Sequence, residues 1–127
     1  MKRLFTTLAF LLILSNVLKA QLNINYYINL GRAQLYTEKY SDAIESFNTV
    51  IKVKPELSDP YFLRGIAKYN LNDYLGAELD YGKAIELKPN HIDALRYRGY
   101  TRLNLKKYYL ALNDFGDAIK LNSIDPD

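Results

Sequence analysis

Residues 58–91 read SDPYFLRGIAKYNLNDYLGAELDYGKAIELKPNH, and their pattern recurs 34 positions earlier and 34 positions later in the chain. No insertion interrupts the recurrence, which predicts stacked copies of one supersecondary unit. The recurring positions hold a glycine, an alanine, a tyrosine, another aromatic residue and a further small or apolar residue. They are Gly31, Gly65 and Gly99; Ala43, Ala77 and Ala111; Tyr40, Tyr74 and Tyr108; Phe47, Tyr81 and Phe115; and Val50, Ala84 and Ala118.

Each copy contains two helical segments. Apolar residues at spacings of three and four predict helices over 24–37, 58–71 and 92–105, alternating with 40–53, 74–87 and 108–121. Pro55 and Pro89 end the second helices, because proline cannot continue a helix. Asp59 followed by Pro60 is typical of an N-cap and a first helical position. The sequence therefore predicts an all-α fold.

This pattern resembles the tetratricopeptide repeat. That family has a large residue early in the first helix, glycine or alanine four residues on, and alanine, an aromatic residue and alanine along the second. The sequence fits as repeats 24–57, 58–91 and 92–125, with Tyr27, Tyr61 and Leu95 at the early position. The resemblance implies a right-handed α-solenoid of three tandem helix-turn-helix repeats, and a repeat domain over 21–127.

The first twenty residues predict a signal peptide. Lys2 and Arg3 precede an apolar run over 4–18, and Ala20 is a small residue at a plausible cleavage point, although Leu18 occupies a place that favours a small one. An uncleaved membrane anchor is the alternative. A helix of that run would span about 22 Å, against about 30 Å for a bilayer core. We therefore expect export to a bacterial periplasm or beyond, without stable membrane insertion after cleavage.

The charge balance argues against a nucleic-acid partner. The whole chain has 17 basic and 14 acidic residues, but Lys2, Arg3 and Lys19 lie in the first twenty, so the rest is neutral. Tyr97 and Tyr100 lie within a basic stretch, which we interpret as a solvated face or an anion-tolerant patch; its members are Arg96, Arg98, Arg102, Lys106 and Lys107. Because the chain has no cysteine, disulfides and thiolate catalysis are excluded.

No pattern in the chain points to catalysis. His91 is the only histidine and is predicted to be a solvated residue of the turn between the second and third repeats. Phosphate-loop, zinc-protease and nucleophile-elbow motifs are missing from the sequence. We therefore expect a non-enzymatic protein without cofactor or metal. Asp80, Glu86, Asp114 and Asp117 are expected mostly on an outer polar face, and Arg64 and Arg98 mark a repeat subtype.

Glycine also occurs inside two of the second helices. Gly82 and Gly116 each cost about 1 kcal/mol relative to alanine in a helix. A close backbone approach would explain them, but we favour a tolerated weakness at the surface.

The resemblance also implies where a partner would bind. In tetratricopeptide repeat proteins the first helices line a concave groove, which suits a peptide or a partner protein with apolar anchors. The alternative for any one residue is packing between adjacent helices. Relatives that bind chaperone tails use lysine, asparagine and arginine at positions occupied here by Ile28, Arg32, Leu63, Asp93 and Tyr97, so such tails are not expected. The predicted groove residues are Asn25, Ile28, Arg32, Tyr36, Phe62, Ile66, Tyr69, Asn70, Arg96, Tyr100 and Asn104.

The last repeat lacks a capping helix. Leu112, Phe115 and Ile119 would leave an apolar face uncovered, and residues 123–127 resemble the junction at 57–61. Two further functions follow. The chain is an assembly or stacking module, either part of a longer repeat array or self-associating through its C-terminal repeat; or it is a regulatory domain of an enzyme.

Overall fold

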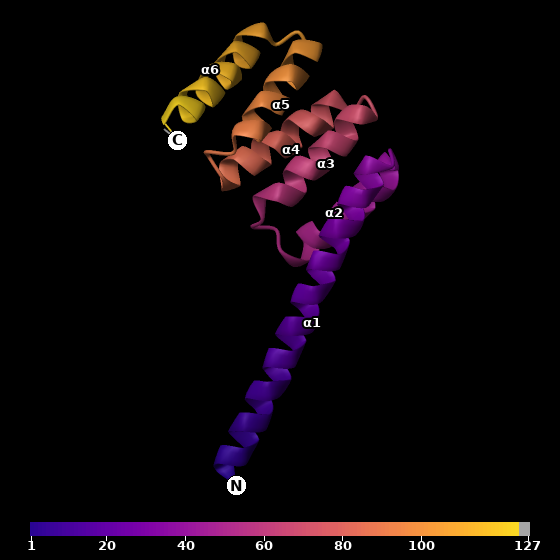
Figure 1. Cartoon of the computed structure of the whole chain (residues 1–127), viewed down its shortest axis with the longest axis vertical. Coiled ribbons are helices and arrows are strands. Elements are labelled where there is room, and N and C mark those ends of the chain that lie inside the picture. Colours follow the sequence, from indigo (N-terminus) through magenta and orange to yellow (C-terminus); the bar gives the residue numbers. More distant parts are fainter. Residues whose placement is uncertain (125–127) are drawn as a thin grey trace.

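The computed structural model describes residues 1–124, and those residues form six helices and no strand. The predicted all-α class is therefore confirmed. Figure 1 shows the helices stacked in chain order at the upper, C-terminal end of one long N-terminal helix. They are α1 (Lys2–Tyr36), α2 (Tyr40–Val53), α3 (Ser58–Asn70), α4 (Tyr74–Leu87), α5 (Ile92–Asn104) and α6 (Tyr108–Ile124).

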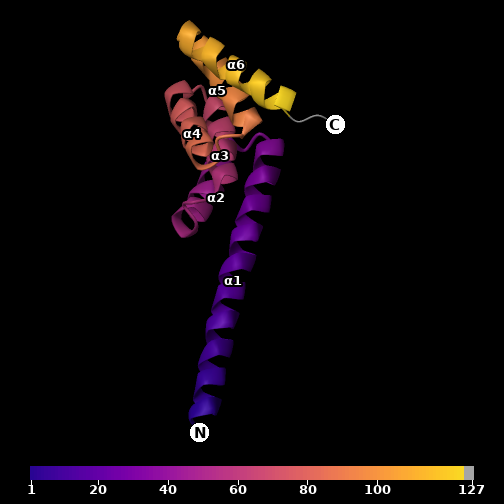
Figure 2. The same ribbon diagram turned by 90° about the vertical axis from the view of Figure 1, so that its left-hand side faces the viewer.

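Consecutive helices pair into hairpins. The pairs are α1 with α2, α3 with α4, and α5 with α6, and the hairpins join where α2 meets α3 and where α4 meets α5. The first hairpin and α6 lie at opposite ends of the stack (Figure 2). α1 also touches α3, which places the first helices of two consecutive hairpins on one side. The result is a solenoid-like stack in which each hairpin contacts only its neighbours in the chain.

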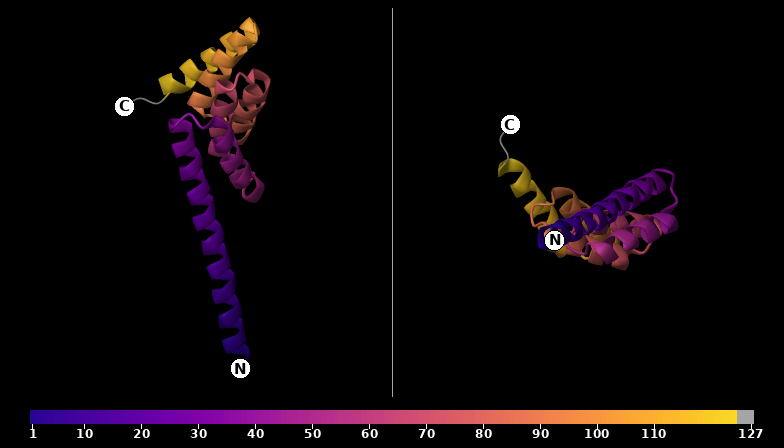
Figure 3. Two further views of the ribbon diagram at one scale, coloured as in Figure 1. Left: turned by 90° about the vertical axis from the view of Figure 1, so that its right-hand side faces the viewer. Right: turned by 90° about the horizontal axis from the view of Figure 1, so that it is seen from below.

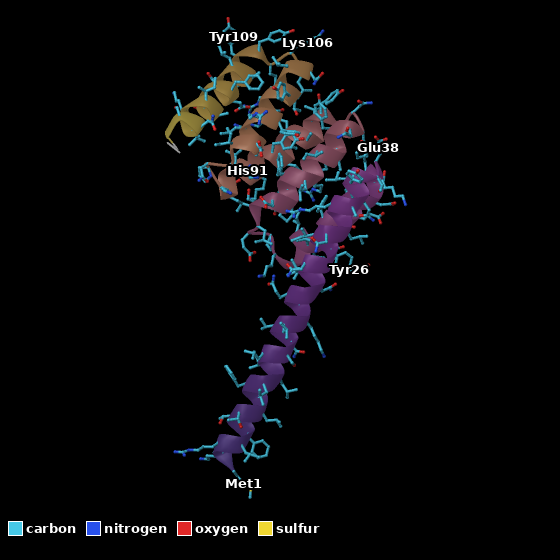
Figure 4. The ribbon with its side chains drawn as sticks, viewed as in Figure 1. Met1, Tyr26, Glu38, His91, Lys106 and Tyr109 are labelled. Carbon is cyan, nitrogen blue, oxygen red and sulfur yellow. The ribbon has the colours of Figure 1, made fainter. Side chains whose placement is uncertain are left out.

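The turn inside each hairpin has the same geometry. Glu38, Asn72 and Lys106 have φ angles of 60°, 63° and 59°, so each ends its helix in the left-handed region. In the first turn the N–H of Lys39 donates to the carbonyl of Gln34 at 2.8 Å, and equivalent bonds close the other two turns. This is the Schellman arrangement, which satisfies the last carbonyls of a helix. Glu38 and Lys106 are labelled at these turns in Figure 4.

Each hairpin is held by an aromatic ring packed on a glycine. A Cβ built on Gly65 of α3 would lie 2.6 Å from Cε1 of Tyr81 in α4, and the other two hairpins repeat this contact. Ala77 of α4 is fully buried, as are its equivalents Ala43 in α2 and Ala111 in α6. These small residues therefore allow the two helices of a hairpin to approach closely, since any added bulk would meet a neighbouring helix.

The helix ends differ from the prediction at one capping site. α2 and α4 have the predicted bounds, and α3 begins at Ser58 as predicted, but its N-cap is Leu57. Asp59 and Pro60 are thus the second and third helical residues, and the predicted N-cap at Asp59 is wrong. Proline is tolerated there because the first N–H groups of a helix have no intrahelical acceptor.

The two glycines of the second helices are explained by open space. A Cβ on Gly82 would meet only Nη1 of Arg98, at 3.6 Å, and one on Gly116 would meet nothing within 4 Å. Neither position involves a close backbone approach, which supports the prediction of a tolerated weakness.

The N-terminal apolar run is continuous with the first hairpin. α1 extends without a break from Lys2 to Tyr36, and residues 1–21 are all exposed. The run projects away from the stacked helices (Figure 3). α1 is long and apolar enough to cross a membrane, a property that signal sequences share. The predicted separate first helix over 24–37 is therefore the C-terminal part of a longer one.

Candidate functional site

The predicted groove residues come from the first helices α1, α3 and α5, at equivalent places in each hairpin. Those of α3 are half-buried, except for one asparagine, whereas most of those of α1 and α5 are exposed. Tyr36 is the most open of the aromatic ones, at 91% exposure. The exposed set is Asn25, Arg32, Tyr36, Asn70, Arg96, Tyr100 and Asn104, and the half-buried set is Ile28, Phe62, Ile66 and Tyr69.

Phe62 is mainly a packing residue between the second and third hairpins. Its ring centroid lies 4.7 Å from that of His91, 5.3 Å from Tyr97 and 5.8 Å from Tyr81. The ring is therefore surrounded by side chains from α4, α5 and the preceding turn. For Phe62, helix packing describes its contacts better than an open groove does.

A polar link joins α3 to α5 on the side that carries the predicted groove. The Nδ2 atom of Asn104 donates to the hydroxyl of Tyr69 at 2.8 Å, and the Tyr69 ring stacks edge-on against Tyr74 at 5.2 Å. Tyr100 keeps half of its surface exposed while its ring meets Phe115 at 5.1 Å. Tyr69 and Tyr100 thus have their orientation fixed by packing, which reduces the entropy that a ligand contact would cost.

The arginines that the sequence marked as a repeat subtype form ion pairs across the second and third hairpins. Arg64 of α3 holds the carboxylate of Asp80 in α4 with two hydrogen bonds of 2.8 and 2.7 Å, and Lys68 lies 3.0 Å from the same carboxylate. The bond to Asp80 raises the pKa of Arg64 more than burial lowers it. Arg64 also donates a hydrogen bond of 2.8 Å to the side-chain oxygen of Asn48 in α2, so this arginine links the first and second hairpins.

The equivalent pair in the third hairpin belongs to a larger network. Arg98 and Arg102 both donate hydrogen bonds to the carboxylate of Asp114. Arg102 also donates to Glu78 of α4 at 2.9 Å, and Lys107 donates to the other oxygen of Glu78 at 2.6 Å. Burial raises the pKa of Glu78, but hydrogen bonds from Lys107 and Arg102 outweigh burial and leave it below its ordinary value. The network links the second and third hairpins.

These contacts correct two predictions about charge. Asp80 and Asp114 are buried and paired, so the expected outer polar face does not include them. The spacing of apolar residues along one helix predicts that its acidic residues face solvent, because that spacing carries no information about basic side chains on a neighbouring helix. Of the basic stretch, Arg98, Arg102 and Lys107 are engaged in ion pairs, so the stretch is not the freely solvated face that we expected.

His91 is buried, at 9% exposure, and caps a helix. Its Nδ1 atom accepts a hydrogen bond from the N–H of Ala94 at 3.1 Å, at the start of α5 (Figure 4). Its Nε2 atom lies 3.4 Å from Oδ1 of Asp59, without the alignment of a hydrogen bond. The predicted solvated role is wrong, since Phe62 covers the ring from the neighbouring hairpin.

One cleft lies beside the last hairpin. It has a volume of about 570 Å³ between α5 and α6, and apolar side chains form much of its lining. Arg96 is the one predicted groove residue among those that line it. Among residues 1–124 no cluster of three or more histidine and acidic side chains is arranged to hold a metal ion. The lining residues are Ile92, Arg96, Phe115, Ala118, Ile119, Asn122 and Ser123.

A family model described as the tetratricopeptide repeat matches residues 28–92. The second TPR of Spaghetti (RPAP3) bound to HSP90 peptide SRMEEVD is similar at 26% identity, covering 81% of this chain and 97% of that chain with a TM-score of 0.76. No curated protein sequence matches.

Two further solved structures are similar in fold. The TPR2B-domain:pHsp70 complex of yeast Sti1 is 24% identical, covering 80% of this chain and 82% of that chain, with a TM-score of 0.78. The MamA RS-1 ArsTM double mutant is 21% identical, covering 82% and 59%, with a TM-score of 0.77. At these identities the likeness concerns the arrangement of helices.

Proposed function

Since the chain belongs to the tetratricopeptide repeat family, we propose that it is a non-enzymatic interaction module that binds a peptide or partner protein. The binding surface is the concave groove lined by α1, α3 and α5. The observation that carries this proposal is the exposure of aromatic side chains on those helices. Tyr36 and Tyr100 are exposed there, and the hydroxyl of Tyr69 accepts a hydrogen bond from Asn104. Rigid, part-exposed tyrosines are typical anchors of protein interfaces.

The side chains of this groove favour an apolar ligand over an acidic tail. Two similar structures hold HSP90 and Hsp70 peptides. The family resemblance implies that relatives which bind such tails use a set of lysine, asparagine and arginine side chains. Here Ile28, Leu63 and Tyr97 take the place of polar members of that set, and Asp93 would repel a carboxylate. Arg32 remains as an exposed cation for a single acidic group. The ligand that suits this surface has aromatic or aliphatic anchors.

The place of action that fits α1 is outside the cytoplasm. The exposed apolar run over 4–18 after Lys2 and Arg3 has the order of a signal peptide. We expect the run to direct export and to be removed, which releases the repeat domain. N-terminal sequencing of the product from an envelope fraction tests this. A chain that still begins at Met1 and stays with the membrane would favour the anchor instead.

The groove can be tested with matched tyrosine variants. Tyr36→Ala and Tyr100→Ala remove exposed rings of α1 and α5, and Tyr109→Ala removes a ring of 87% exposure from α6 as the control. Partner recovery from envelope extract, quantified by mass spectrometry, should fall about tenfold or more for the first two and stay unchanged for the control. Equal recovery by all three variants would refute the groove as the binding surface.

Assembly through α6 is the second candidate function, and the cleft beside α5 and α6 is the observation that favours it. Part of the predicted self-association argument concerned residues 125–127, which lie outside the described residues. Light scattering on the chain and on an Ile119→Glu variant separates a self-associating protein from a monomer.

A further inference from the structure

Gln21 of α1 is bonded to the far end of α2. Its Oε1 atom accepts a hydrogen bond of 3.1 Å from Nζ of Lys54, a half-buried residue that directly follows α2. Its Nε2 atom donates to Oδ1 of Asn25 at 3.4 Å, within α1. Gln21 itself is exposed, whereas Ile24 is buried at 3% exposure. The folded hairpin therefore begins close to the predicted cleavage point at Ala20.

Removal of residues 1–20 creates an uncompensated charge at this place. Gln21 then begins the helix with a free α-amine, beside the ammonium group of Lys54 and at the end where the helix dipole is positive. α1 contains no acidic residue, and the first one in the chain is Glu38, beyond its other end. A charged amine is therefore disfavoured at Gln21, and the neutral amine is the nucleophilic form.

The nucleophile and the group that it attacks belong to the same residue. Once Gln21 begins the helix, its α-nitrogen has no intrahelical acceptor, because the first N–H groups of a helix lack one. This nitrogen can attack Cδ of the side-chain carboxamide and close a lactam ring. The Oε1 atom gathers negative charge as the ring closes, and Lys54 donates its hydrogen bond to that same atom. Lys54 is therefore placed to stabilise the charge of the intermediate.

We propose that Gln21 is a modification site, which closes to pyroglutamate with the help of Lys54 after residues 1–20 are removed. The bond from the α-nitrogen to Cδ forms, and the bond from Cδ to Nε2 breaks. A proton passes from the α-nitrogen to the leaving nitrogen, which departs as ammonia, and nothing is oxidised or reduced. The inference rests on the proposed removal of the signal peptide.

The product suits its surroundings better than the free glutamine does. The lactam is neutral, so the repulsion between the α-amine and Lys54 is removed, and the end of the helix no longer carries an added positive charge. The lactam keeps a carbonyl oxygen that can accept the hydrogen bond from Lys54. The modified chain also lacks the free α-amine at which aminopeptidases begin.

Tryptic digestion and mass spectrometry of the product from an envelope fraction distinguish the N-termini, even where a lactam blocks chemical sequencing. Trypsin cuts after Lys19 and Arg32, so a retained signal gives the peptide 20–32. Cleavage after Ala20 gives the peptide 21–32 with a free amine, and ring closure lowers its mass by one ammonia. An isotope-labelled synthetic peptide 21–32, added before digestion, reports closure during handling.

We expect most of the product to carry the lactam while the labelled peptide stays open. Peptide 21–32 with a free amine would overturn the modification and leave the proposed export intact. Peptide 20–32 alone would overturn both the removal of the signal and the modification. A mature chain that begins at another residue would keep export and exclude Gln21 as the site.

The rate of closure after a pulse of labelled synthesis tests the role of Lys54. Lys54→Met should slow closure at least about threefold, whereas Lys54→Arg keeps a cationic donor and should close like the wild type. Lys52→Met removes an exposed cation from the last turn of α2 and is the matched control, with an unchanged rate. Gln21→Asn should keep its free amine, because its shorter side chain cannot close an unstrained ring. Equal rates in Lys54→Met and Lys52→Met would overturn the role of Lys54.

Discussion

Two glycines beside Phe115 offer a test of how the hairpins are packed. Gly99 lies in α5, and an added Cβ would stand 2.7 Å from Cε1 and 2.8 Å from Cζ of the Phe115 ring. Gly116 follows Phe115 in α6, and a Cβ there would meet nothing within 4 Å. Changing each to alanine adds the same methyl group to the same hairpin in two different surroundings.

The magnitudes follow from these surroundings. Alanine is more favourable than glycine in a helix by about 0.5–1 kcal/mol, and Gly116→Ala should gain this amount in free energy of unfolding. Gly99→Ala gains the same intrinsic term, but the methyl group must displace a packed ring, and overpacking costs about 1–3 kcal/mol. The two variants should therefore differ by about 1–3 kcal/mol, with Gly99→Ala below the wild type.

Urea unfolding followed by circular dichroism measures the difference, provided that the dependence on urea is the same in all variants. Adding Phe115→Leu to Gly99→Ala should recover part of the loss, with a coupling of at least about 0.5 kcal/mol, because the ring that the methyl group meets is gone. If Gly99→Ala stabilises the protein as much as Gly116→Ala does, the ring-on-glycine contact does not limit the approach of the helices.

Three further outcomes are expected. Tyr81→Phe should raise the free energy of unfolding by about 1 kcal/mol, because the buried hydroxyl has no hydrogen-bond partner among the described residues; a decrease in the same urea assay would show that it is bonded. His91→Ala should cost about 0.5–2 kcal/mol and speed amide exchange at Ala94, while His91→Asn keeps the cap; equal exchange in both would contradict the capping role. The lowered pKa of Glu78 means that its carboxylate stabilises the fold above its ordinary value of 4.5 and loses that contribution as the pH falls through the folded value. Glu78→Gln should therefore reduce the loss of stability as the pH falls below 4.5, and an unchanged pH dependence in that range would contradict this.

The helices were predictable because their determinants are local. Pro55 and Pro89 end the second helices from within the sequence, and the bounds of α2 and α4 agree with the prediction. The N-cap of α3 was predicted wrongly at Asp59, since Ser58, Asp59 and Pro60 are all compatible with a first helical turn. α1 merges with the apolar run because no residue between 20 and 24 stops a helix.

The ion pairs and His91 were missed because their partners lie on other helices. A signal for the pairs was nevertheless present in the sequence. Arg64 and Asp80 are separated by the same interval as Arg98 and Asp114, and the first repeat has neither member, with Leu30 and Ser46 instead. Arginine and aspartate that appear and disappear together indicate contact. For His91 the repeats offer no similar pair of residues that change together. The equivalent position in the first repeat is Leu57, and a leucine side chain gives no sign that a helix cap forms at this place. The ligand of the groove could not be predicted either. It depends on exposed side chains that differ between the repeats, whereas the 34-residue pattern describes only the packing positions that the repeats share.

The two joints of the stack respond differently to salt. Phe47 and Ala67 share an apolar cluster that spans α2 and α3, and Ala84 and Ala94 share one that spans α4 and α5, so cooling weakens both joints. The joint between α4 and α5 adds the ion pairs of Glu78 with Arg102 and Lys107, which dissolved salt weakens. High ionic strength therefore loosens the stack more next to α6 than next to α1.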